Sequence, residues 1–126
     1  MSKVLLVDDS AVMRKIIQRK IEQTGLMVDE FVEAGDGKEA LEKVNDNDNI
    51  DLILLDWNMP NMSGIEFVRE LRSLDIQNRI PVVIVTTEGR EDKISEAKKS
   101  GADGYLTKPF TTDQLRDTLG SYLLIK

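Results

Sequence analysis

The sequence predicts an α/β protein in which a mostly parallel β-sheet is covered by helices on both faces. Short runs rich in Val, Ile and Leu alternate five times with segments whose apolar residues recur at helical spacing, as in repeated βα units. These runs are apolar at nearly every position, which is typical of strands buried on both faces. The chain has 126 residues and no linker, repeat or change of composition, so we expect one domain, residues 1–126.

Five strands and five helices are expected in strict alternation. The predicted strands span residues 4–7, 27–34, 52–55, 82–85 and 105–107. The second of them alternates less cleanly than the others, so we place it near an edge of the sheet. The helices are predicted at residues 10–24, after the turn at 35–37, and at residues 63–74, 90–100 and 112–124. Strict alternation of this kind favours a parallel sheet.

Helical spacing predicts which side chains face the core. The residues expected to be buried are Met13, Ile16, Ile17 and Ile21 in the first helix, Ala40, Leu41 and Val44 in the second, Ile65, Val68 and Leu71 in the third, and Leu115, Leu119, Tyr122 and Leu123 in the last. Phe67 and Leu74 are expected at the margin of the third helix. The fourth helix offers only Ile94 and Ala97 as an apolar face, so we expect it to be among the more mobile elements.

The composition excludes several kinds of chemistry. There are 17 Lys and Arg against 23 Asp and Glu, a formal net charge of −6, which argues against a surface for nucleic acid. The chain contains no Cys and no His, so disulfides, thiolate nucleophiles, thiolate zinc sites and histidine bases are excluded. No apolar run approaches the length of a membrane span or of a signal-peptide core. We therefore expect a cytoplasmic protein that binds neither nucleic acid nor membranes.

Four of the predicted strands end on residues that suit metal-assisted phosphoryl chemistry. Asp8 and Asp9 follow the first strand, and Asp56 follows the third. Thr86 follows the fourth strand and Lys108 follows the fifth. Each of these residues alone has an ordinary explanation as a turn, cap or surface residue. Because ligands of open α/β sheets bind outside the carboxyl ends of the strands, their joint placement predicts one pocket with three carboxylates, a hydroxyl and an ammonium group.

Three carboxylates in one pocket require a compensating charge. Two carboxylates about 4 Å apart repel by about 4 kcal/mol at an effective dielectric constant of about 20, so the group must bind a cation or take up protons. Mg²⁺ prefers hard oxygen ligands and commonly joins carboxylates to a phosphate. A carboxylate can itself accept a phosphoryl group as an acyl phosphate. The ammonium and hydroxyl groups are suited to hydrogen-bonding the added negative charge.

These residues lie in a longer pattern that resembles the receiver domains of bacterial two-component response regulators, most closely the single-domain chemotaxis regulators. The matching segments are Val-Asp-Asp-Ser at 7–10, Asp-Trp-Asn-Met-Pro-Asn-Met-Ser-Gly at 56–64, Thr-Thr-Glu at 86–88 and Gly-Tyr-Leu-Thr-Lys-Pro-Phe at 104–110. They extend over nearly the whole chain. The resemblance implies a flavodoxin-like (βα)5 fold, a doubly wound parallel five-stranded sheet with strand order 2-1-3-4-5.

The resemblance also implies roles for the residues of the pocket. Asp56 would be the phosphoacceptor and Lys108 would contact the phosphoryl group. Asp9 and Asp56 would bind Mg²⁺ directly, together with the backbone carbonyl of Asn58, while Asp8 would act mostly through water. The Lys108-Pro109 peptide bond is expected to be cis, as in the family.

Three further positions are assigned by the same resemblance. Thr86 and Tyr105 would form the switch pair: the hydroxyl moves toward the phosphoryl group and the aromatic ring then turns inward. Tyr105 could instead be an amphipathic residue that merely covers its strand. Asn58 and Glu88 occupy the two positions that tune phosphoryl lifetime, and this pair resembles the fast-hydrolysing chemotaxis class.

The function that the resemblance implies is a phosphorylation-activated response regulator, a monomeric switch rather than an enzyme. A histidine kinase would supply the phosphoryl group, and the phosphorylated form would bind an effector such as the flagellar motor switch; a phosphatase is a further expected partner. Glu91 and Thr118 stand where many enteric chemotaxis regulators carry Lys, which leaves the effector open. The alternatives are a phosphorelay intermediate, an isolated receiver of a larger regulator, or a small phosphatase with an aspartyl-phosphate intermediate. That last class usually has Asp where this chain has Asn58.

Overall fold

Five parallel strands form one sheet in the order β2-β1-β3-β4-β5, which confirms the predicted fold. The computed structural model describes residues 2–46, 49–57, 62–74, 79–87 and 91–123. The strands are β1 (Lys3–Val7), β2 (Glu30–Ala34), β3 (Leu52–Asp56), β4 (Val82–Thr86) and β5 (Gly104–Thr107). The helices are α1 (Ala11–Gln23), α2 (Gly37–Asp46), α3 (Gly64–Ser73), α4 (Glu91–Ser100) and α5 (Thr112–Leu119).

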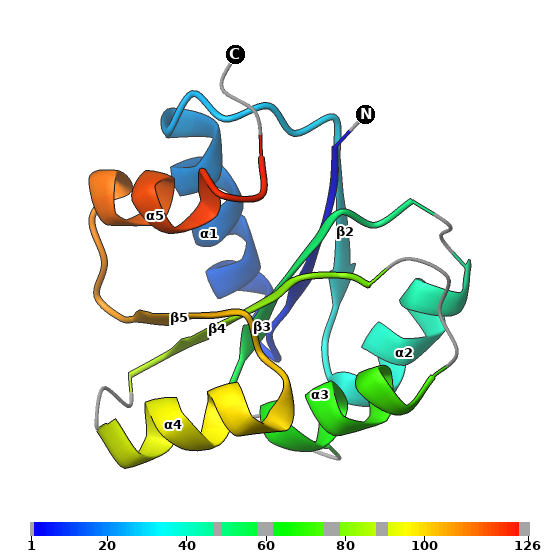
Figure 1. Cartoon of the computed structure of the whole chain (residues 1–126). Helices are drawn as coiled ribbons and strands as arrows, with labels where there is room; N and C mark the ends of the chain where they lie inside the picture. The colour runs from blue at the N-terminus through cyan, green and yellow to red at the C-terminus, as the bar shows by residue number, and fades with distance from the viewer. Residues whose placement is uncertain (1, 47–48, 58–61, 75–78, 88–90, 124–126) are drawn as a thin grey trace.

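The helices divide between the two faces of the sheet. Figure 1 shows α1 and α5 on one face, and α2, α3 and α4 on the other. Successive strand residues point to opposite faces, so Leu5 and Val7 belong to the core under α2–α4, whereas Val4 and Leu6 belong to the core under α1 and α5. Burial on both faces explains why the strands are apolar throughout and why the edge strand β2, which is partly exposed, is not.

Several local details differ from the sequence prediction. β2 begins at Glu30 rather than at residue 27 because its partner strand begins at Lys3, which is paired with Glu30. Ile16 was predicted to face the core but is 40% exposed, and Phe67 was predicted at the margin of its helix but is fully buried. Phe67 is buried because α3 lies between α2 and α4, so a wider part of its surface is covered. α5 ends at Leu119, before the predicted end of the last helix.

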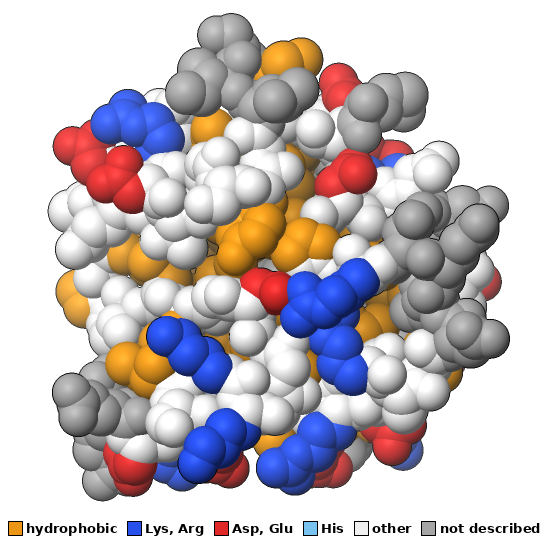
Figure 2. All heavy atoms as spheres, viewed as in Figure 1, with side chains coloured by type: hydrophobic (Ala, Val, Ile, Leu, Met, Phe, Trp, Pro, Cys, Tyr) orange, Lys and Arg blue, Asp and Glu red, His pale blue; other side chains and the backbone are white. Residues whose placement is uncertain are grey.

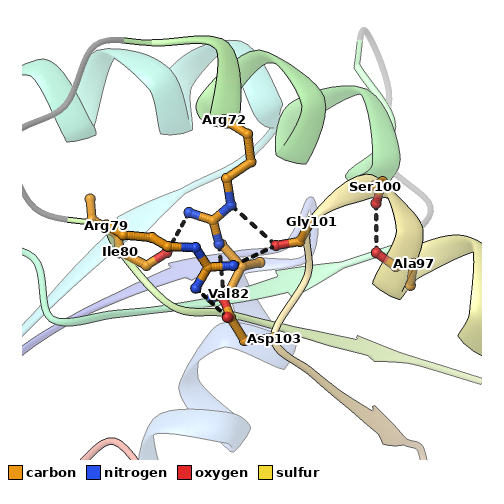
Figure 3. Close-up of polar contacts among 8 residues, drawn as sticks. All are labelled: Arg72, Arg79, Ile80, Val82, Ala97, Ser100, Gly101 and Asp103. Carbon is orange, nitrogen blue, oxygen red and sulfur yellow. Dashed lines mark hydrogen bonds and ion pairs between the residues drawn. The ribbon is translucent and has the colours of Figure 1, made fainter.

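A polar cluster ties α3, β4 and the α4–β5 loop together at the amino ends of the strands (Figure 3). The guanidinium group of Arg72 donates hydrogen bonds to the carbonyl oxygens of Gly101 and Ile80 and to the carboxylate of Asp103, at 3.1, 2.8 and 2.9 Å. Asp103 also accepts the backbone N–H of Val82 at 2.9 Å and pairs with Arg79. We call this cluster the Arg72 clamp.

Among the described residues, no helix combines the length and the apolar character needed to cross a membrane. Figure 2 shows basic side chains around α4 on the face that is turned to the viewer, and the basic residues of this helix are Lys93, Lys98 and Lys99.

Candidate functional site

The carboxyl ends of four strands bring the predicted site residues together. Asp8 directly follows β1, and Asp56 is the last residue of β3. Thr86 is the last residue of β4, and Lys108 directly follows β5. Because these strands are parallel and adjacent, their ends meet at one edge of the sheet. The site is therefore a direct product of the strand order.

Three carboxylates face one another in this site. One oxygen from each of Asp8, Asp9 and Asp56 lies within 4.8 Å of the other two. Asp8 is buried, Asp56 is partly buried and Asp9 is exposed. The Asp8 carboxylate is oriented by the backbone N–H of Ser10, which donates to its Oδ1 at 2.9 Å. The cluster is thus open to solvent on the side of Asp9.

The pKa values of the two less exposed acids, Asp8 and Asp56, are raised mainly because the groups are partly removed from water. Burial and, to a smaller extent, the negative charge of Asp8 together raise the pKa of Asp56 to about 6, against the opposing effect of Lys108. Burial also raises the pKa of Asp8. A divalent cation would favour the ionised forms. Since the donors are hard carboxylate oxygens, the residues present fit Mg²⁺, which keeps several of its waters when bound.

Lys108 supplies the positive charge of the site. Its Nζ lies 3.6 Å from Oδ2 of Asp8 and 3.7 Å from Oδ1 of Asp56. The Lys108-Pro109 peptide bond is cis, as expected. The backbone N–H of Lys108 donates to the carbonyl oxygen of Thr86 at 2.7 Å, so the start of the loop is fixed to the neighbouring strand.

The two predicted switch residues lie on adjacent strands. Thr86 is buried, with 1% of its surface exposed, and Tyr105 is partly buried against the core under α2–α4. The Tyr105 ring meets the Trp57 ring edge-on, with centroids 6.3 Å apart and planes at 67°. Nζ of Lys93, on α4, lies 5.6 Å from the centroid of Trp57. An aromatic cluster therefore joins the residue after Asp56 to β5 and α4.

Some expectations concern residues outside the described part of the chain. The proposed roles of Asn58, as a metal ligand through its carbonyl and as a lifetime-tuning residue, and of Glu88 both lie there. They remain predictions from the sequence.

Two residues that shape the site were missed by sequence reasoning. Arg14 donates from a guanidinium nitrogen to the backbone carbonyl oxygen of Asp8 at 2.5 Å and from Nε to Glu33 at 3.0 Å. Gly64 approaches the backbone so closely that a Cβ there would lie 2.8 Å from the carbonyl oxygen of Asp56. The position of Arg14, one turn into the helix after Asp8 and Asp9, was an available signal. The close approach of Gly64 to the backbone of Asp56 and Trp57 is a tertiary contact that no local pattern indicates.

The fold and the site define a class of proteins. A parallel sheet of order 2-1-3-4-5, with an acidic cluster, a buried threonine and a lysine at its carboxyl end, is the arrangement that the sequence resemblance implied for a receiver domain. Residues 4–120 match the sequence model of the response regulator receiver domain family. The chain belongs to this family.

Several similar proteins are named as chemotaxis proteins. The chain is 38% identical over 117 residues to chemotaxis protein CheY1 of Helicobacter pylori, covering 93% of each protein. It is also 38% identical to chemotaxis protein CheY of Pseudomonas aeruginosa, covering 93% of this chain and 92% of that protein. The crystallised chemotaxis response regulator CheY4 of Vibrio cholerae shares 39% identity with a TM-score of 0.84, covering 98% of this chain and 99% of that one.

Proposed function

We propose that this receiver domain accepts a phosphoryl group on Asp56 and acts as a phosphorylation-activated switch in a chemotaxis system. The observation that carries the proposal is that Nζ of Lys108 lies 3.6 Å from Asp8 and 3.7 Å from Asp56 at the carboxyl end of the sheet. The similarity to chemotaxis proteins supports the assignment to a chemotaxis system. A histidine kinase is the proposed donor. The protein is proposed to be a cytoplasmic monomer and a switch rather than an enzyme acting on other molecules.

The side chains of the site suit transfer from a phosphohistidine. A carboxylate oxygen of Asp56 attacks phosphorus, so an O–P bond forms while the N–P bond to the donor imidazole breaks, and that nitrogen keeps the electron pair and takes up a proton. The Lys108 ammonium group is close enough to pair with the Asp56 carboxylate before transfer and with the new phosphoryl oxygens after it. The Thr86 hydroxyl group would donate to the same oxygens after its side chain rotates toward them.

The three acids are the proposed holders of Mg²⁺. Asp9 and Asp56 would be direct ligands with the Asn58 carbonyl, and Asp8 would act mostly through water. When bound, Mg²⁺ would neutralise negative charge on the carboxylates and on the phosphoryl group. Asp8 also has a role that needs no metal, because its carboxylate helps to hold the Lys108 ammonium group over the site.

The effector is proposed to bind at the surface of α4, β5 and α5. α4 carries a shallow hollow of about 600 Å³ lined by Ile94, Ser95, Lys98 and Lys99. This helix therefore presents lysines, although Glu91 on α4 and Thr118 on α5 stand where many enteric regulators carry Lys. The flagellar motor switch is the proposed effector, and a phosphatase is a further proposed partner. Tyr105 lies on β5, next to this surface.

Covalent labelling tests the proposal. Incubation of the protein with Mg²⁺ and acetyl phosphate should add one phosphoryl group, which mass spectrometry should place on Asp56 and which hydroxylamine should remove. The Asp56→Asn variant should be labelled far less. Equal labelling of both proteins would exclude Asp56 as the nucleophile, and rapid turnover of simple phosphoesters would favour the phosphatase alternative.

A further inference from the structure

Lys20 joins α1 to the loop that carries Lys108. It lies in the last turn of α1, and its Nζ donates a hydrogen bond to the backbone carbonyl oxygen of Phe110 at 3.1 Å. The same ammonium group lies 4.8 Å from the centroid of the Phe110 ring, within the range of a cation–π contact. One charged group therefore holds both the backbone and the side chain of a residue that is 90 positions away in the sequence.

The contact is placed where it can restrain the catalytic lysine. Phe110 follows Lys108 by two residues, and its ring is buried in the core between the sheet and the helices α1 and α5. Lys108 is itself held on the side of the sheet, because its backbone N–H donates a hydrogen bond to the carbonyl oxygen of Thr86 at 2.7 Å. The segment that carries Lys108 is thus fixed at both ends, once to β4 and once to α1.

Simple packing does not explain why this position is a lysine. Leucine or methionine would cover the Phe110 ring equally well, but neither could donate to its carbonyl oxygen. A partly buried ammonium group also loses hydration, which is favourable only where it gains a partner of this kind. A cation in the last turn of α1 is additionally stabilised by the helix dipole.

We propose that Lys20 is a positioning residue for Lys108. By fixing the Phe110 backbone to α1, it keeps the Lys108 ammonium group at 3.6 and 3.7 Å from Asp8 and Asp56, ready to contact the incoming phosphoryl group. This inference rests on the proposed phosphoryl transfer to Asp56. Small displacements of a positioning group can slow a reaction strongly, so the effect should appear in the rate of transfer.

The test compares Lys20→Met, which keeps the aliphatic stem without the charge, with Lys20→Arg, which keeps a cationic donor. Arg19→Met is the matched control, since it removes one positive charge from an exposed neighbouring position on the same helix. The first measurement is the initial rate of Asp56 labelling by acetyl phosphate in saturating Mg²⁺. The second, which does not depend on activity, is hydrogen exchange at the Lys108 amide in the unlabelled protein.

We expect Lys20→Met to be labelled about three- to ten-fold more slowly than the wild type, because the loop loses its charge-assisted hydrogen bond to α1. Its Lys108 amide should exchange faster, Lys20→Arg should recover most of the rate, and Arg19→Met should behave as the wild type. A wild-type rate and amide exchange in Lys20→Met would overturn this inference alone. Equal slowing in Lys20→Arg or Arg19→Met would also overturn it, by showing a general effect of charge or stability. Absence of labelling in the wild type would overturn the proposed function as well.

Discussion

Replacing Asp56 by Asn should stabilise the metal-free protein at neutral pH. The carboxyl group of Asp56 is partly buried, close to Asp8, and its pKa is raised from 3.8 to about 6. The folded protein therefore holds this proton more tightly than the unfolded chain does. As the pH rises from about 4 to about 6, the folded state binds more protons than the unfolded state, so stability falls through this range. Above it, the ionised carboxylate opposes folding by a constant amount.

The size of this effect follows from the pKa. A rise from 3.8 to about 6, at about 1.4 kcal/mol for each pKa unit, corresponds to about 3 kcal/mol at pH 7.5. At pH 4.5 Asp56 is mostly protonated in the folded protein but mostly ionised in the unfolded chain. The destabilisation relative to a neutral side chain is then only about 1 kcal/mol. Asparagine is neutral and nearly isosteric, so Asp56→Asn should recover most of this free energy.

Urea unfolding in EDTA, followed by the fluorescence of Trp57, measures the difference directly. The free energy of unfolding of Asp56→Asn should exceed that of the wild type at pH 7.5, by up to about 3 kcal/mol, and the difference should shrink at pH 4.5. Saturating Mg²⁺ should stabilise the wild type more than the variant, because the variant has lost a ligand. A variant that is less stable than the wild type at pH 7.5, or a gain that does not change with pH, would refute the reasoning.

Three further predictions concern metal binding, the switch and the core. Mg²⁺ should change the fluorescence of Trp57 saturably, because this residue directly follows Asp56, and this change should be lost in Asp9→Ala. Beryllofluoride with Mg²⁺ should shift the backbone amide NMR signals of Ile94 and Tyr105 as well as those of the site, and Tyr105→Ala should weaken effector binding by about 5–150-fold. Phe67→Ala should lower the free energy of unfolding by about 3–5 kcal/mol in urea, because that side chain is fully buried.

Each of these predictions has a contrary result. If Mg²⁺ left the fluorescence of the wild type unchanged, or if Asp9→Ala responded as the wild type does, the result would count against the metal site. NMR changes confined to the acidic pocket would contradict the switch. A loss of less than about 1 kcal/mol in Phe67→Ala would show that α3 is not held as described.

The elements and the convergence of the site could be predicted because both depend on short-range pattern. The strands β1, β3 and β4 are apolar on both faces, so their approximate extents could be predicted from the sequence. The parallel arrangement then requires Asp8, Asp56 and Lys108 to meet. The beginning of β2 was not predictable in the same way, since it depends on where β1 starts: Lys3 pairs with Glu30. Residues 27–29 have a strand-like composition but no partner residues on β1.

Details that depend on contacts between elements could not be predicted. Whether Ile16 or Ile17 faces the core depends on the rotation of α1 against the sheet, and Ile17 is the buried one. Phe67 is buried because two other helices flank α3. The contact of Lys20 with Phe110 spans 90 residues, so no local pattern indicates it.

The Arg72 clamp gives α4 the geometry of a lever. Gly101, which follows the last residue of α4, is held to α3 by Arg72, whereas the other end of the helix lies toward the carboxyl edge of the sheet (Figure 1). A helix of ten residues is about 15 Å long, so a tilt of about 10° around a fixed end moves the far end by about 2.6 Å. A small tilt about this fixed end would therefore displace the first residues of α4 more than the last ones. Arg72 and Asp103, which hold this end of α4, lie at the opposite end of the strands from the residues of the acidic site.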